Sequence, residues 1–155
     1  MRDALVIADS SCLILLDKIN ELEILRSIYK KIYITEEIAE EFSSDIPQWI
    51  EIKEVKNKTL QSLFEDTLDI GESSALALAF ETQDCTVILD DLKARKTAAK
   101  MNIKVTGTIG VILKAKKENK IPSVKLVFDK IQETNFRISD RIINEALRKA
   151  GEYSP

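Results

Sequence analysis

The chain has 155 residues, of which 45% are hydrophobic and 32% are charged, a composition typical of one globular domain with a sizeable core. It has no histidine, and Cys12 and Cys85 stand alone in apolar segments. These features exclude a Ser-His-Asp triad, a histidine-activated cysteine and a zinc site of Cys and His ligands. The net charge is −3, so the chain lacks the excess of Lys and Arg that is typical of nucleic-acid-binding proteins.

The sequence carries no signal for a membrane or for secretion. No apolar stretch approaches the roughly 20 residues that a membrane span requires. The first residues, MRDALVIADSS, lack the long apolar segment and the small-residue cleavage site of a signal peptide. We therefore expect a soluble cytoplasmic protein in which residues 1–155 form a single domain.

Predicted strands and helices alternate along the chain. The apolar runs at 4–8 and 86–90 are typical of buried parallel strands, and 50–55 alternates as an edge strand does. In chain order we predict strand 4–8, helices 11–18 and 20–29, strand 31–34, helix 35–43, strand 50–55, helices 58–66 and 71–82, strand 86–90, helix 92–101, strand 103–106, and helices 108–119, 122–134 and 139–150. This order predicts an α/β fold, a three-layer α/β/α sandwich around a parallel sheet of four or five strands.

Acidic residues follow the two strongest predicted strands. Asp9 comes directly after 4–8, while Asp90 and Asp91 end the run TVILDD. Open α/β sheets bind ligands at the C-terminal ends of their strands, so acids at these positions indicate a divalent-metal site. Each also has a structural alternative, because Asp9 can cap the helix that follows it and Asp91 is well placed to cap the helix at 92–101. Asp90 is the better functional candidate of the pair.

The helix predicted at 35–43 contributes a further acid. Ile34, Ile38 and Phe42 recur every four residues and define its buried stripe. At about 100° per residue, Glu41 lies roughly 60° from the centre of that stripe and Glu40 roughly 160° from it. We therefore expect Glu41 to reach an interior site and Glu40 to face water.

Glu72 has two interpretations. It lies in the first turn of a helix whose next residues are small and apolar, which is typical of an element packed in the interior. An acid in that first turn can face the crevice above the sheet. Asp69 and Glu72 are also spaced as in a capping box, in which Glu72 satisfies backbone donors. Both interpretations stay open from the sequence.

These segments together resemble a known family. DSSCLILL, ITEEIAEEF, LDIGESSALALA and VILDDLKARKTAAKMNIKVTGTIGVILKAKK are similar to the PIN domain, in a prokaryotic branch related to the VapC toxin ribonucleases, over nearly the whole chain. The resemblance implies a homodimeric nuclease that binds Mg²⁺ or Mn²⁺, cuts RNA and, as a toxin, has an antitoxin partner. It places the catalytic acids at Asp9, Glu41, Glu72 and Asp90, with Asp91 as a further metal ligand or a substitute for Asp90.

Metal binding fits the charges of such a site. Two carboxylates ~5 Å apart repel by about 3 kcal/mol at an effective dielectric constant of ~20, so four of them need a compensating cation. A bound divalent cation lowers the pKa of a water molecule and stabilises charge on a phosphodiester, which requires no histidine.

Four further residues are candidates for contact with nucleic acid. Ser10 can bond a phosphate or a metal-bound water, or cap a helix. Lys93, Arg95 and Lys96 follow the fourth acid and can approach the RNA backbone, although Arg95 can equally pair with a structural acid. The alternative to a nuclease is a catalytically weak PIN-fold module that binds a protein partner through its helical faces.

Overall fold

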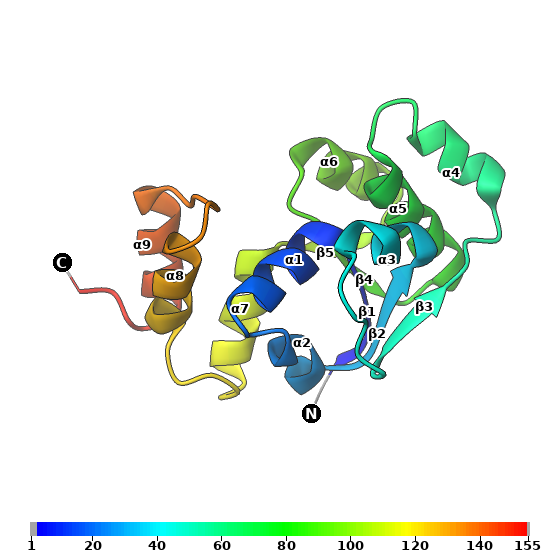
Figure 1. The fold of residues 1–155 in the computed structure, drawn as a ribbon. Helices are drawn as coiled ribbons and strands as arrows, with labels where there is room; N and C mark the ends of the chain where they lie inside the picture. The colour runs from blue at the N-terminus through cyan, green and yellow to red at the C-terminus, as the bar shows by residue number, and fades with distance from the viewer. Residues whose placement is uncertain (1–2, 155) are drawn as a thin grey trace.

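The structure is a computed structural model that describes residues 3–154, with the backbone alone for Asp3 and Ala4. The strands are β1 (Asp3–Ala8), β2 (Tyr29–Thr35), β3 (Ile50–Lys53), β4 (Thr86–Ile88) and β5 (Lys104–Thr106). The helices are α1 (Ser10–Lys18), α2 (Glu23–Ile28), α3 (Glu36–Phe42), α4 (Lys58–Phe64), α5 (Ile70–Thr82), α6 (Leu92–Lys100), α7 (Thr108–Lys117), α8 (Val124–Gln132) and α9 (Asp140–Lys149). The predicted α/β/α class with a parallel sheet is confirmed (Figure 1).

The sheet is parallel throughout, with strand order β3-β2-β1-β4-β5. From β1 the chain first builds outward through β2 and β3, and later returns to add β4 and β5 on the other side. The order therefore reverses between β1 and β4, and ligands of open α/β sheets bind at such a switch point. Ala8 pairs with Ile88, so the C-terminal ends of β1 and β4 lie side by side.

Helices cover both faces of the sheet. In Figure 1, α1, α2 and α7 lie on one side of it, and α4, α5 and α6 lie on the other. Helix α5 is the most deeply packed of these, because every residue from Ser73 to Ala79 is buried. Helix α3 contacts both α1 and α5 and so connects the two layers near the switch point.

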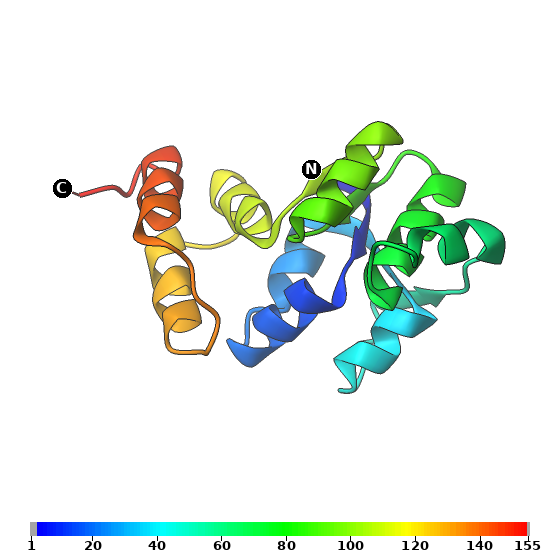
Figure 2. The same cartoon turned by 90° about the horizontal axis from the view of Figure 1, so that it is seen from above.

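The last two helices form a hairpin outside these layers. Figures 1 and 2 show α8 and α9 packed beyond α7, away from the sheet. The Glu152 carboxylate anchors the start of α8 by accepting from the Ser123 hydroxyl and the Val124 N–H, both at 2.7 Å. Among residues 3–154, no helix is long and apolar enough to cross a membrane.

Three predicted boundaries are wrong in an instructive way. The predicted helix at 20–29 is the shorter α2, because Tyr29 already pairs with Asp3 in the sheet. The predicted strand at 50–55 ends at Lys53, and the strand at 86–90 ends at Ile88. One more sheet bond, from the Leu89 N–H to the Thr106 carbonyl, follows β4. Asp90 therefore stands just beyond the paired region, where its side chain can turn toward another element.

Candidate functional site

Asp9 is the most buried acid at the switch point. It is the N-cap of α1, accepts a 2.8 Å bond from the Ser10 N–H and is only 4% exposed. Burial is the main cause that raises the pKa of this carboxyl to about 7; the Ser10 N–H opposes the rise, and the charges of Asp69, Glu41 and Asp90 add to it. The cap predicted as an alternative is therefore present, and the same carboxylate lies among other acids.

Glu41 reaches this group of acids from α3. Its Oε1 accepts a 2.9 Å bond from the Ser10 hydroxyl. A Cβ on Gly71 would collide with the same Oε1, so the glycine permits α5 to approach α3 closely. The predicted buried stripe of Ile38 and Phe42 is present, but Glu41 itself is exposed and lies at the open rim of the site.

Glu72 takes part in the predicted cap and also lies near other acids. Asp69 is the N-cap of α5 and accepts a 2.8 Å bond from the Glu72 N–H, while the Glu72 carboxylate accepts from the Asp69 N–H, as in a capping box. Burial, followed by the charges of Asp69, Asp91 and Asp9, raises the pKa of Glu72 to about 7. The capping carboxylate is thus also a member of the acidic group.

Asp69 is the acid that the site prediction missed. Its charge raises the pKa of both Asp9 and Glu72 and is the first of the neighbouring charges in each case. The sequence contained a usable signal, because an N-cap aspartate one turn before Glu72 lies at the same helix end. The capping-box spacing by itself assigns Asp69 only a structural role.

The adjacent aspartates Asp90 and Asp91 cap two different helices. Asp91 is the N-cap of α6 and accepts a 3.0 Å bond from the Ala94 N–H, as predicted for its structural alternative. Asp90 turns to α7, where it accepts from the Thr108 N–H at 2.8 Å and the Thr108 hydroxyl at 2.6 Å. Asp90 acts electrostatically on Asp9. Asp91 adds its charge to Glu72 in the same way, so both aspartates act on the acidic group, and Asp90 stays the predicted fourth acid.

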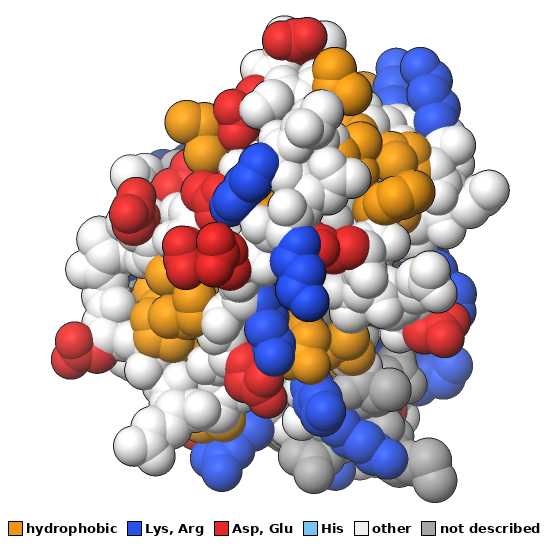
Figure 3. All heavy atoms as spheres, turned by 90° about the vertical axis from the view of Figure 1, so that its right-hand side faces the viewer, with side chains coloured by type: hydrophobic (Ala, Val, Ile, Leu, Met, Phe, Trp, Pro, Cys, Tyr) orange, Lys and Arg blue, Asp and Glu red, His pale blue; other side chains and the backbone are white. Residues whose placement is uncertain are grey.

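The candidate basic residues lie beside these acids on α6. Lys93, Arg95 and Lys96 are all exposed. Arg95 donates a 3.1 Å bond to the Leu89 carbonyl rather than pairing with a structural acid. Figure 3 shows the right-hand side of Figure 1, where basic, acidic and apolar side chains are interspersed.

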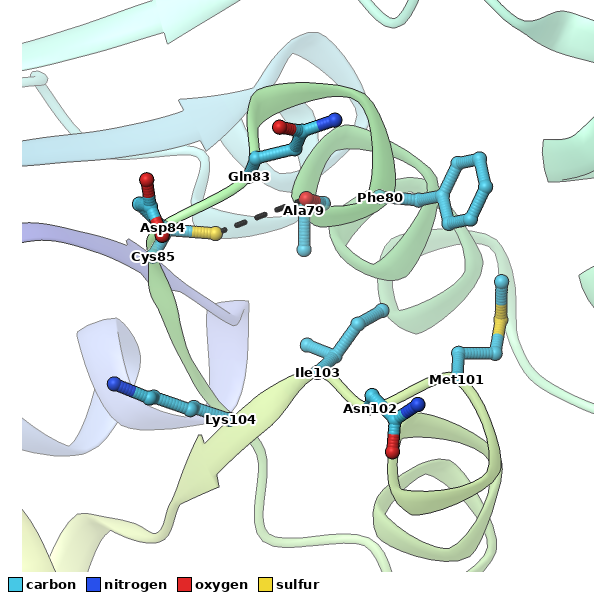
Figure 4. Close-up of a pocket in the computed structure, with 9 residues that line it drawn as sticks. All are labelled: Ala79, Phe80, Gln83, Asp84, Cys85, Met101, Asn102, Ile103 and Lys104. Carbon is cyan, nitrogen blue, oxygen red and sulfur yellow. Dashed lines mark hydrogen bonds between the residues drawn. The ribbon is translucent and has the colours of Figure 1, made fainter.

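A hollow elsewhere on the molecule contains none of the predicted site residues. It lies where β4 and β5 begin, at the opposite end of these strands from the acids, and is shown in Figure 4. The lining residues include Cys85, whose Sγ lies 3.8 Å from the Ala79 carbonyl oxygen, and Lys104. The candidate site is therefore the group of acids at the switch point, which we call the acidic rim: Asp9, Glu41, Asp69, Glu72, Asp90 and Asp91.

The donor chemistry of this rim fits a hard divalent cation. Its acids offer carboxylate oxygens, the ligands that Mg²⁺ and Mn²⁺ prefer. Within residues 3–154, no three or more Asp, Glu or Cys side chains are already gathered closely enough to hold an ion. Mg²⁺ commonly keeps several waters and binds through one or two carboxylates, so a looser group of acids still suits it.

The fold and the rim define an α/β protein with an acidic site at its topological switch point. A family model described as a PIN domain matches residues 5–152, and the chain belongs to the PIN-domain family. PIN domains are generally nucleases and typically use divalent metals, so this is a nuclease-type fold. Comparisons with curated proteins and with solved structures gave no match.

Two neighbouring glutamates provide a matched test of the site's boundary. We expect Glu41→Gln to weaken Mn²⁺ binding, because Glu41 bonds Ser10 and adds its charge to Asp9. Glu40→Gln makes the same chemical change one residue away and should leave Mn²⁺ affinity unaltered. Calorimetric titration of both variants measures this. Equal losses in both would place the boundary of the site elsewhere on α3.

Proposed function

We propose that the protein is a metal-dependent endoribonuclease that uses Mg²⁺ or Mn²⁺. The observation that carries the proposal is the state of Asp9, a buried carboxylate whose pKa is raised by burial and by three surrounding acids. Carboxylates grouped at a switch point repel one another when no cation is present. A divalent cation removes this repulsion, so the group favours cation binding. Membership of a family whose members are generally nucleases supports phosphodiester cleavage as the proposed chemistry of this site.

In the proposed mechanism, the acids that would hold the cation are Asp9, Glu41, Glu72 and Asp90, one or two of them directly and the others through its bound waters. Asp91 is a further candidate ligand, and Asp69 lies near the same group. A bound divalent cation supplies a water of lowered pKa and neutralises charge on the scissile phosphate. Ser10 keeps the Glu41 carboxylate turned toward α1 through their 2.9 Å bond. Asp9 and Glu72 must both be ionised to serve as ligands, so metal binding should strengthen as the pH rises through about 7.

RNA is the proposed substrate, and the exposed cations of α6 are its proposed contacts. Lys93, Arg95 and Lys96 follow the Asp91 cap and can pair with backbone phosphates next to the acidic rim. Single-stranded or loop segments are the proposed form of the substrate, because proteins recognise RNA mostly in such segments. A homodimer and an antitoxin partner, as in VapC-type toxin pairs, are part of the same proposal.

Cleavage of defined RNAs tests this function. Purified protein with Mn²⁺ or Mg²⁺ should cut single-stranded or loop RNA and leave duplex DNA largely intact. EDTA and rising salt should both slow the cleavage, because they remove the cation and screen the phosphate contacts. If a broad panel of structured and unstructured RNAs stays intact with either metal, the proposal is wrong.

One observation favours a second candidate, a catalytically weak PIN-fold module that binds a protein. The described acids are not gathered into a ready-made metal cluster. A protein that lacks nuclease activity but copurifies in a stable complex with a partner protein would support this alternative. Retention of acids at all four expected positions favours the nuclease.

A further inference from the structure

Thr108 holds the Asp90 carboxylate by two bonds from one residue. Its N–H donates to Asp90 Oδ1 at 2.8 Å and its hydroxyl donates to Oδ2 at 2.6 Å. Thr108 is 4% exposed, whereas Asp90 is exposed. A buried residue therefore fixes the orientation of an exposed acid through two hydrogen bonds.

The sequence around Thr108 makes this contact possible. Gly107, the N-cap of α7, has no side chain with which to cap that helix, so Asp90, in the segment that follows β4, takes the capping role. A Cβ on Gly107 would lie 2.9 Å from both Asp90 Oδ1 and an Arg95 guanidinium nitrogen. The glycine thus leaves room for the carboxylate to approach the start of α7.

Thr108 also faces the interior below the acids. It lies close enough to the buried Cys12 thiol to act on the pKa of that group, as the charges of Asp9 and Asp90 also do. Thr108 therefore lies between the core and the acidic rim, where packing fixes its position. The two short hydrogen bonds from Thr108 in turn fix the position of the Asp90 carboxylate.

We propose that Thr108 is a positioning residue of the nuclease site, one that holds the Asp90 carboxylate toward Asp9 for cation binding. The inference rests on the proposed function. Two hydrogen bonds occupy about half of the roughly four acceptor positions of a carboxylate, so Asp90 keeps positions for a cation. Residues that orient a metal ligand in this way commonly alter metal affinity by about 10-fold to 100-fold when they are replaced.

Replacement of the hydroxyl tests the inference. Thr108→Val keeps the shape and the backbone N–H but removes the donor to Oδ2. We expect Mn²⁺ affinity, measured by calorimetry without RNA, to fall by about 10-fold. Thr108→Ser should restore the affinity, because its hydroxyl can donate to the same oxygen. Thr106→Val is the matched control: it loses the same hydroxyl in β5, where the Thr106 side chain contacts the Gly107 carbonyl and not Asp90.

Each outcome decides the inference. Wild-type Mn²⁺ affinity in Thr108→Val overturns it, as does an equal loss in Thr108→Ser or in Thr106→Val. If Thr108→Val fails to fold, Thr108→Ala takes its place in the same comparison. A wild-type protein that binds Mn²⁺ but cuts no RNA would refute the proposed function and leave the Thr108 comparison decisive. A wild-type protein that binds no Mn²⁺ refutes both.

Discussion

Asp9→Asn is expected to lower the rate of RNA cleavage by at least ~100-fold in saturating Mn²⁺. Asp9 is the buried acid at the centre of the group, and the loss of a metal ligand removes several kcal/mol of transition-state stabilisation, where each 1.36 kcal/mol is tenfold in rate. Initial rates on a labelled single-stranded RNA measure the effect. Asp90→Asn should show a loss of the same order.

An exposed aspartate provides the control for charge alone. Asp17 lies in α1, the helix that Asp9 caps, and is exposed, so Asp17→Asn should cut RNA at the wild-type rate. Cleavage that survives in both Asp9→Asn and Asp90→Asn would indicate a contaminating ribonuclease. A similar loss in Asp17→Asn would show that net charge, not the acidic rim, controls the rate.

The second large effect concerns stability without metal. Between the ordinary pKa of 3.8 and its folded value of about 7, Asp9 is protonated in the folded protein and ionised in the unfolded chain. The folded state therefore binds more protons, and stability should fall as the pH rises across this interval and then level off above pH 7. The shift corresponds to at most about 4 kcal/mol at 1.36 kcal/mol per pKa unit. Glu72 acts in the same direction.

Urea unfolding in EDTA between pH 4.5 and pH 7.5 measures this dependence. Asp9→Asn cannot ionise, so its stability should vary much less with pH than that of the wild type, and at pH 7.5 it should be the more stable protein. Parallel pH profiles for the two proteins would show that the Asp9 carboxyl is not desolvated in the folded state.

Much of the architecture could be predicted from local patterns. The apolar run ALVIA forms β1, and Val6, Ile7 and Ala8 are fully buried, because a central parallel strand is covered on both faces. Its position fixed the place of Asp9. The alternation of strands with helical segments led directly to the parallel sheet, since crossover connections require it.

The contacts between the acids could not be predicted in this way. The direction in which the Asp90 side chain turns depends on the start of α7, 18 residues further along the chain, where Thr108 supplies both donors. A pattern in VILDD contains no information about that partner. Asp69 is hard to assign from the sequence for a different reason: capping and membership of an acidic group are compatible, so a capping-box pattern does not reveal the second role.

The central claim is that the acidic rim at the switch point binds a divalent cation. Calorimetric titration with Mn²⁺ tests this claim most directly. It should be done above pH 7, where Asp9 and Glu72 are ionised. We expect saturable binding to the wild-type protein, accompanied by a higher melting temperature, and loss of both effects in Asp9→Asn. Equal binding and an equal rise in melting temperature in the two proteins would contradict the account.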